Sequence, residues 1–359
     1  MPGNGNTHGP KPTTRYPVVS YEDARTAAAE RRKSFPFKFP RDPRHMGGKY
    51  TVEENARRLL RFFYFERRLS HALGSWTLAI PEFEVKIETG RHIFYHADAA
   101  HTLRTRLNEQ EISMRTIDAY RDAEIDTFIE EMLSAADAAE LLVGVHQVAG
   151  RLLATAYKHH IDNTCPVTDA PTIRALQRIL VDYPSMLDWA DAALAAYVDG
   201  GVDEDRLFAW RWHLQDLLKS IGGITGADER TNAPLELRSA KTPYVRNTVP
   251  HRDSRFTTFH HTGDYDVADG TPRFDKESYE GLRLRFIRTQ RDEVDAIEAF
   301  GTFLWDIRFK DFKAEYDLAR ITWDEACHTE IAHRTLLACG SDPFELPNRL
   351  TRSTCRWPL

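Results

Sequence analysis

The chain has 359 residues, 42% of them hydrophobic and 28% charged, a balance typical of a globular protein with one large domain or two of ordinary size. The formal net charge of −6 gives no general reason to expect nucleic acid or an anionic membrane as a partner. No apolar run reaches the roughly 18 residues of a membrane-spanning helix. Because the N-terminal stretch also lacks the apolar core of a signal peptide, we expect a cytoplasmic protein.

The cysteine pattern excludes two common site types. The four cysteines are scattered, without a C-x-x-C pair: Cys165, Cys327, Cys339 and Cys355. This spacing argues against a zinc ribbon or a redox dithiol and suits reduced, packed thiols.

The first half of the chain is predicted to be a mobile arm followed by helices. Residues 1–48 are rich in Pro, Gly, Lys and Arg and lack apolar periodicity, which predicts the arm. Residues 49–222 carry helical patterns; Thr51 and Glu54 have capping-box spacing, so a helix should begin there. Pro81 opens a second helical segment, which Gly90 weakens without necessarily ending it.

The second half returns to helices after an irregular stretch. Residues 223–275 lose apolar periodicity, and we interpret them as a linker or a substrate-shaping lid. Residues 276–340 form a second helical hairpin, and 341–359 a C-terminal tail. Because alternating apolar and polar runs are scarce throughout, the sequence predicts an all-α protein packed as a bundle.

Acid-x-x-His pairs are the chemical pattern that stands out. With 54 acidic residues and 15 histidines, chance alone predicts about two such pairs. The chain contains four: Asp42/His45, Asp98/His101, Glu325/His328 and Glu330/His333. Residues three apart project from one helix face, so each pair can direct both side chains at one ion.

Sequence context separates these pairs. Asp42 lies among prolines and is expected in a loop, and the Glu330 pair is turned roughly 140° from Glu325. The other two pairs continue apolar stripes, formed by Leu318, Ile321 and Ala332 for Glu325/His328, and by Ile87, Phe94 and Ala97 for Asp98/His101. Acids on apolar faces are costly to bury unless they are paired or bind a metal.

Each of the two hairpins also carries a single acid on its first helix. Glu66 stands 32 residues before Asp98, and Glu293 stands 32 residues before Glu325. The matched spacing suggests that six inward side chains meet around metal ions. Several alternatives stay open: Glu298 competes with Glu293, Glu66 could instead form a buried ion pair with an arginine such as Arg104, and His92 and His96 crowd the helix of Asp98.

The arrangement resembles the ferritin-like superfamily. The stretch "DEVDAIEAF…DLARITWDEACHTEI" is similar to ferritin-like proteins related to the tRNA-hydroxylating di-iron enzymes. The resemblance covers about 286–340 well and 51–107 more loosely, and it implies a ferritin-like four-helix bundle holding two iron ions, with manganese as an alternative. It also implies ligand roles: Glu66 and Glu293 as terminal ligands, Asp98 and Glu325 as bridges, His101 and His328 as caps.

This resemblance implies an oxidoreductase that activates dioxygen to oxidise or hydroxylate a small organic substrate with an external electron donor. No catalytic residue beyond the metal ligands is assigned. No nucleic-acid or membrane partner is expected, and a homodimer is compatible with the sequence. Two departures favour the alternative of a non-catalytic ferritin-like binding or scaffold protein with an incomplete metal site. Asp98 replaces the usual Glu, and Tyr183 and Met186 occupy positions where relatives carry an acid-x-x-His pair; Glu140 is then the best acid of the middle helices.

Overall fold

The computed structural model confirms the all-α prediction. The residues that it describes are 19–38, 47–232, 234–259, 275, 277–346 and 348–349. The chain divides into two compact units, Met1–Arg44 and His45–Leu359. In the described part of the second unit, the two-residue strands β1 (Thr258–Phe259) and β2 (Asn348–Arg349) pair in parallel.

The first unit contains a helix that the sequence analysis did not predict. Helix α1 (Tyr21–Ser34) is capped by Ser20, whose hydroxyl accepts a hydrogen bond from the backbone N–H of Asp23. Acidic residues in its first turn and basic residues in its last turn suit the helix dipole. No residue of α1 is buried, so the sequence carries no apolar stripe to indicate this helix.

The predicted first hairpin consists of α2 (Val52–Trp76) and α3 (Phe83–Glu109), which pack on each other. Thr51 caps α2 as predicted, with its hydroxyl accepting from the Glu54 N–H at 3.2 Å. Helix α3 runs through Gly90 without interruption. A Cβ atom built at Gly90 would lie 3.0 Å from the Cβ of Ala326, so glycine is what allows α3 to approach the second hairpin this closely.

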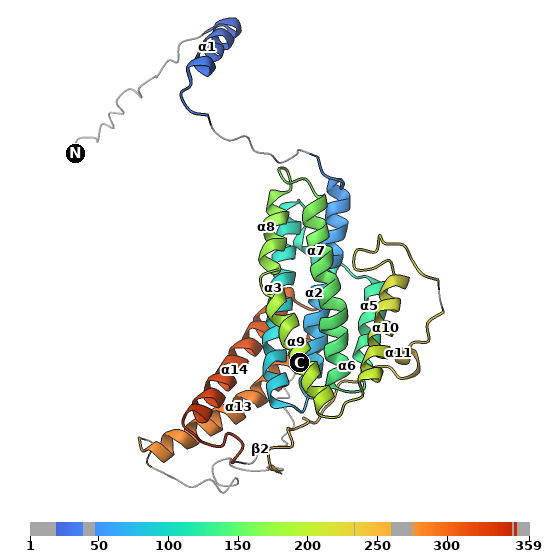
Figure 1. Ribbon diagram of the computed structural model, residues 1–359, viewed down its shortest axis with the longest axis vertical. Helices are drawn as coiled ribbons and strands as arrows, with labels where there is room; N and C mark the ends of the chain where they lie inside the picture. The colour runs from blue at the N-terminus through green and yellow to red at the C-terminus, as the bar shows by residue number, and fades with distance from the viewer. Residues whose placement is uncertain are drawn as a thin grey trace, which may run out of the picture. The chain divides into compact units, whose positions relative to one another are not determined.

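The second hairpin consists of α13 (Tyr279–Asp306) and α14 (Phe312–Ala338). Helix α13 packs on α2, and α14 packs on α3 (Figure 1). The backbones of α2 and α13 nearly touch, because a Cβ at Gly74 would lie 2.8 Å from the carbonyl oxygen of Gly301. Small residues at this crossing therefore determine how close the two hairpins lie.

The remaining helices lie between the two hairpins in sequence. They are α4 (Met114–Ala119), α5 (Ala123–Leu133), α6 (Ala138–Leu142), the π-helix η1 (Val143–Gly150), α7 (Arg151–Asn163), α8 (Ala170–Ile179), α9 (Tyr183–Asp199), α10 (Glu204–Ser220) and α11 (Arg238–Lys241). Helices α9 and α10 pack on η1, and α8 packs on α3 (Figure 1). Two glycines follow the end of α10: Gly222 and Gly223 adopt φ values of 79° and 69°, which glycine allows readily.

The core is centred on α2. Its apolar side chains are fully buried over several turns, including Leu59, Phe62, Phe65, Leu69 and Leu73 at 0% exposure. Burying each such side chain stabilises the fold by roughly 1.5–3 kcal/mol. Because α2 is covered all round, its charged residues in this stretch are buried too and need partners within the protein. None of the described helices combines the length and the apolar character that crossing a membrane requires.

The close crossing of α2 and α13 predicts that Gly74→Ala destabilises the protein. The added methyl group meets backbone that cannot yield easily, and such overpacking costs about 1–3 kcal/mol. This exceeds the roughly 1 kcal/mol that alanine gains in a helix. Urea unfolding measures the change, and Gly47→Ala, whose Cβ meets nothing within 4 Å, is the control. If G74A unfolded at the same urea concentration as the parent protein, the close contact between α2 and α13 at Gly74 would be contradicted.

Candidate metal centre

Three of the six predicted ligands converge between the helices of the second hairpin. Glu293 of α13 and Glu325 and His328 of α14 each offer a donor atom, and these atoms all lie within 4.8 Å of one another. The His328 Nδ1 lies 3.1 Å from Glu325 Oε2 and 4.0 Å from Glu293 Oε1. The side chain of Glu293 is 28% exposed, that of Glu325 is 18% exposed, and that of His328 is 54% exposed.

The cluster lies on the outer side of the contact between α13 and α14. The inner side is formed by neighbouring residues, since Ala326 and Val294 are buried together with Phe83 and Ile87 of α3. A helix turns about 100° per residue, so Glu325 lies beside this core rather than within it. An ion bound by the three side chains would therefore remain accessible to solvent.

The two carboxylates repel each other unless a proton or cation lies between them. Burial, a hydrogen bond with Glu325 and the negative charge of Glu325 raise the pKa of Glu293 to about 7. At neutral pH the pair therefore holds a proton part of the time. A metal cation can replace this proton, and His328 supplies a nitrogen donor beside it.

Glu66 lies elsewhere, in a buried cluster of hydrogen bonds. Its side chain is 0% exposed. His96 Nδ1 lies 2.6 Å from Glu66 Oε2, Tyr183 donates to Oε1 at 2.6 Å, and Tyr157 donates to the same oxygen. Each of the three donors comes from a different helix, namely α3, α9 and α7. Three donors suffice to stabilise a buried carboxylate without a metal.

The tyrosines of this cluster are hydrogen-bond donors rather than phenolates. Burial, followed by the charge of Glu66, raises the pKa of Tyr157 and of Tyr183 well above its ordinary value. Both hydroxyls therefore keep their protons. A further buried pair lies on α3 and η1, where His92 Nδ1 and His146 Nε2 are 2.9 Å apart.

Asp98 and His101 face α14 instead of Glu66. The Tyr316 hydroxyl donates to Asp98 Oδ1 at 3.0 Å, and the ring of His101 packs against Tyr316 with centroids 4.7 Å apart. Asp98 follows His96 by two residues, which is about 200° around the helix. Asp98 therefore lies near the level of His96 along α3 but points away from Glu66, so the 32-residue spacing does not bring the two acids together.

The structure therefore does not bring all six side chains together. Near Glu66, α14 contacts α2 through Glu315, which pairs with Arg67 at 2.7 Å. Glu325 lies ten residues further along α14, which is about 15 Å of helix. Asp98 contacts Tyr316, which precedes Glu325 by nine residues on α14. Asp98 is therefore also far from Glu325 along this helix. Glu66, Asp98 and His101 are not part of the group formed by Glu293, Glu325 and His328.

The competing acids have other partners. Glu298 is buried and pairs with Lys86 and Arg252, and Glu140 accepts from Arg206 at 2.9 Å. The expected partner of Glu66, Arg104, binds Asp118 instead. In the second acid-x-x-His pair of α14, Glu330 binds Arg91 and Arg334 while His333 contacts Gln290. The pair Asp42/His45 lies outside the described residues.

The sequence analysis identified some, but not all, of the buried cluster. His96 was noted only as a crowding neighbour, and Tyr183 only as a departure from an acid-x-x-His pattern. Tyr157 was missed, and its position in an apolar helical stripe gave no signal that distinguishes it from a packing residue. Comparison with family models, curated proteins and solved structures finds no match to this chain.

The buried cluster predicts that Tyr183→Phe destabilises the fold by about 1.5–3 kcal/mol, the usual cost of losing a hydrogen bond to a charged group. Urea unfolding at neutral pH measures the loss. Tyr279→Phe is the matched control, because Tyr279 is 60% exposed and donates only a long hydrogen bond of 3.4 Å. Equal effects of the two substitutions would show that Tyr183 does not stabilise Glu66.

Buried histidines predict a loss of stability in mild acid. Burial lowers the pKa of His71 and of His160 to about 4 and that of His146 to about 3, and lowers that of His92 well below its ordinary value. The unfolded chain takes up protons below about pH 6.5, whereas the folded chain does so only near these lower values. The free energy of unfolding should therefore fall between pH 6.5 and 4, by up to about 1.4 kcal/mol per pH unit for each histidine.

Urea unfolding at pH 7, 6 and 5 tests this dependence. His160→Phe should flatten the slope by up to one proton, since an aromatic ring is kept beside Phe62 while the titrating group is lost. Lys158→Gln, at an exposed position of the same helix, is the control and should leave the slope unchanged. If H160F and the parent protein show the same slope, the burial of His160 does not contribute to it.

Proposed function

We propose that the protein is a metal-binding helical scaffold protein that holds one divalent transition-metal ion at Glu293, Glu325 and His328. The observation that carries this proposal is the convergence of three donor atoms within 4.8 Å, while the other three predicted ligands have protein partners elsewhere. Among the functions considered from the sequence, a single-metal site on a non-catalytic scaffold thus fits this geometry better than the two-iron oxygenase.

The donor set fits a first-row transition ion. Carboxylate oxygens suit Mn²⁺ and Fe²⁺, and an imidazole nitrogen also suits Zn²⁺ and Fe²⁺. A two-iron site needs further bridging and terminal carboxylates, such as those of the carboxylate-bridged bundle sites. Within the described residues no further His, Cys, Asp or Glu joins the group. A bound ion would supply a Lewis-acid centre with coordination positions left for solvent or an anionic ligand.

A ferritin-like origin of the scaffold is part of the proposal. It is supported by the neighbour relations of α2, α3, α14 and α13, each of which packs on the next and the last on the first. A different set of four helices, α2, α3, α7 and α9, each contributes one side chain to the Glu66 cluster, which supports a former site at that cluster rather than between the two hairpins. In this interpretation Tyr183 occupies a former ligand position, and the buried cluster is an incomplete metal site stabilised by hydrogen bonds instead.

Metal titration of the intact chain tests the proposal. We expect isothermal titration with Mn²⁺ or Zn²⁺ to give one ion per chain. Glu325→Ala should weaken binding by at least the roughly 10–100-fold that loss of an outer-sphere partner costs, because it removes a direct ligand. Glu66→Gln is the matched control: it changes an acid of similar sequence context outside the group, and one ion should still bind.

Two results would contradict this assignment. Two iron ions per chain, both lost in E66Q, would restore the two-iron enzyme. Unchanged metal affinity in E325A would show that the three side chains are an ordinary surface cluster. A circular-dichroism spectrum with unchanged helix content would confirm that either variant is folded.

A further inference from the structure

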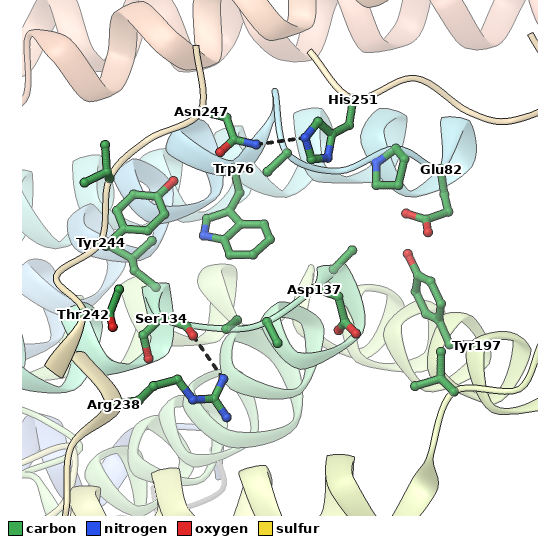
Figure 2. Close-up of a pocket in the computed structure, with 18 of the residues that line it drawn as sticks. Trp76, Glu82, Ser134, Asp137, Tyr197, Arg238, Thr242, Tyr244, Asn247 and His251 are labelled. Atoms are coloured by element: carbon green, nitrogen blue, oxygen red, sulfur yellow. Dashed lines mark hydrogen bonds between the residues drawn. The ribbon is translucent and has the colours of Figure 1, made fainter. Parts of the chain in front are cut away.

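A large cavity lies apart from the metal centre. Its volume is about 1110 Å³, above the 300–1,000 Å³ of ordinary small-molecule sites. Its walls come from the end of α2 and the loop after it, the α5–α6 connection, the end of α9 and the segment 238–251 (Figure 2). This segment belongs to residues 223–275, which the sequence analysis interpreted as a linker or lid.

Hydrogen bonds hold the segment 238–251 in place over the cavity. The backbone N–H of His251 donates to the Leu78 carbonyl at 2.7 Å, and the Tyr244 hydroxyl donates to the Ser75 carbonyl at 3.0 Å. At the other end, Glu131 accepts from the N–H groups of Arg238 and Ser239. The wall is thus built by specific contacts rather than by a loose loop.

One end of the cavity is acidic. Figure 2 shows the Glu82 carboxylate and the Tyr197 hydroxyl pointing toward each other across this end. Burial and the neighbouring carboxylates, Glu82 foremost, raise the pKa of Tyr197 well above its ordinary value. Glu82 forms no ion pair with any residue in the described part of the chain.

The other charged groups of the lining are already paired. Asp137 binds Arg206 at 2.6 Å, and Arg238 binds Glu140 at 2.6 Å. Arg238 also donates to the Ser134 carbonyl at 3.1 Å (Figure 2). An occupant therefore meets one uncompensated charge, that of Glu82. This charge favours a cationic ligand.

Apolar and aromatic groups form the rest of the wall. The indole of Trp76 is stacked on the ring of Tyr244, with centroids 6.3 Å apart and planes 10° apart. Three buried polar atoms of the lining have no hydrogen-bond partner among the described residues: Glu82 Oε2, Tyr197 Oη and Trp76 Nε1. Buried polar atoms are paired in most proteins, so these three atoms are available to hydrogen-bond an occupant of the cavity.

We propose that this cavity binds a small amphipathic amine, with the ammonium group held by Glu82 and Tyr197 and an apolar or aromatic body against Trp76. The ammonium group donates hydrogen bonds to the Glu82 carboxylate and the Tyr197 oxygen. The aromatic body covers the indole and the alanine-rich α5–α6 connection. None of the metal-centre residues lines this cavity, so the proposal is independent of the metal site.

Calorimetric titration of the intact chain with three indoles tests the proposal. Tryptamine carries an ammonium group, 3-ethylindole lacks it, and indole-3-propionate replaces it with a carboxylate. We expect tryptamine to bind at least about tenfold more tightly than 3-ethylindole, as a charge-assisted hydrogen bond in a buried site provides, and indole-3-propionate not to bind. Glu82→Gln should remove the preference for tryptamine.

Matched variants distinguish binding at this cavity from non-specific effects of a substitution on ligand affinity. Glu236→Gln removes an exposed acid outside the cavity and should leave the affinity for tryptamine unchanged. Ala196→Phe adds volume at an exposed position of the lining and should weaken tryptamine and 3-ethylindole alike. Glu325→Ala should lose metal but keep tryptamine affinity. Absence of tryptamine binding at millimolar concentration, or binding that E82Q leaves undiminished, overturns the proposal.

Discussion

The burial of a carboxylate in the central helix is the constraint on which the rest of the structure depends. An isolated buried charge costs several kcal/mol, and Glu66 is 0% exposed. Its oxygens are hydrogen-bonded by His96, Tyr157 and Tyr183, which belong to three other helices. All three donors must reach one carboxylate at once. This requirement fixes the heights at which α3, α7 and α9 pack on α2, in a way that apolar contacts alone would not.

A second buried charge cluster positions the C-terminal hairpin. Arg67 and His71 of α2 both bind Glu315 of α14, at 2.7 and 2.9 Å. Burial works against the ionised carboxyl group, but the hydrogen bonds from His71 and Arg67 outweigh it and lower the pKa of Glu315 to about 2. Because this contact fixes the start of α14 beside the middle of α2, Glu325 extends about 15 Å beyond it. The proposed metal centre is therefore separated from Glu66 by the same contact that joins the hairpins.

Contacts that depend on spacing within one helix or between neighbouring helices can be predicted from the sequence. Contacts that depend on which face of a helix a distant element covers cannot. The grouping of Glu293, Glu325 and His328 was predictable because a three-residue spacing and two neighbouring helices determine it. The partner of Glu66 was not predictable from the sequence. His96 and Asp98 are only two residues apart along α3, and they differ in the side of the helix from which their side chains project. That direction is set by α7 and α9, which are distant in sequence. Helix α1 was missed for a different reason, since it buries no face that could leave an apolar pattern.

Two acids of α13 show why only one of them is suited to an external cation. Glu298 follows Glu293 by five residues, about 140° around the helix, and so points to the opposite side. There it pairs with Lys86 of α3 and with Arg252, the residue that follows the cavity-lining segment 238–251. Its charge is thus compensated within the fold. Glu293 instead meets the carboxylate of Glu325, and the nearby imidazole of His328 compensates only part of the pair. The charge left over at this position is what the proposed metal ion would neutralise.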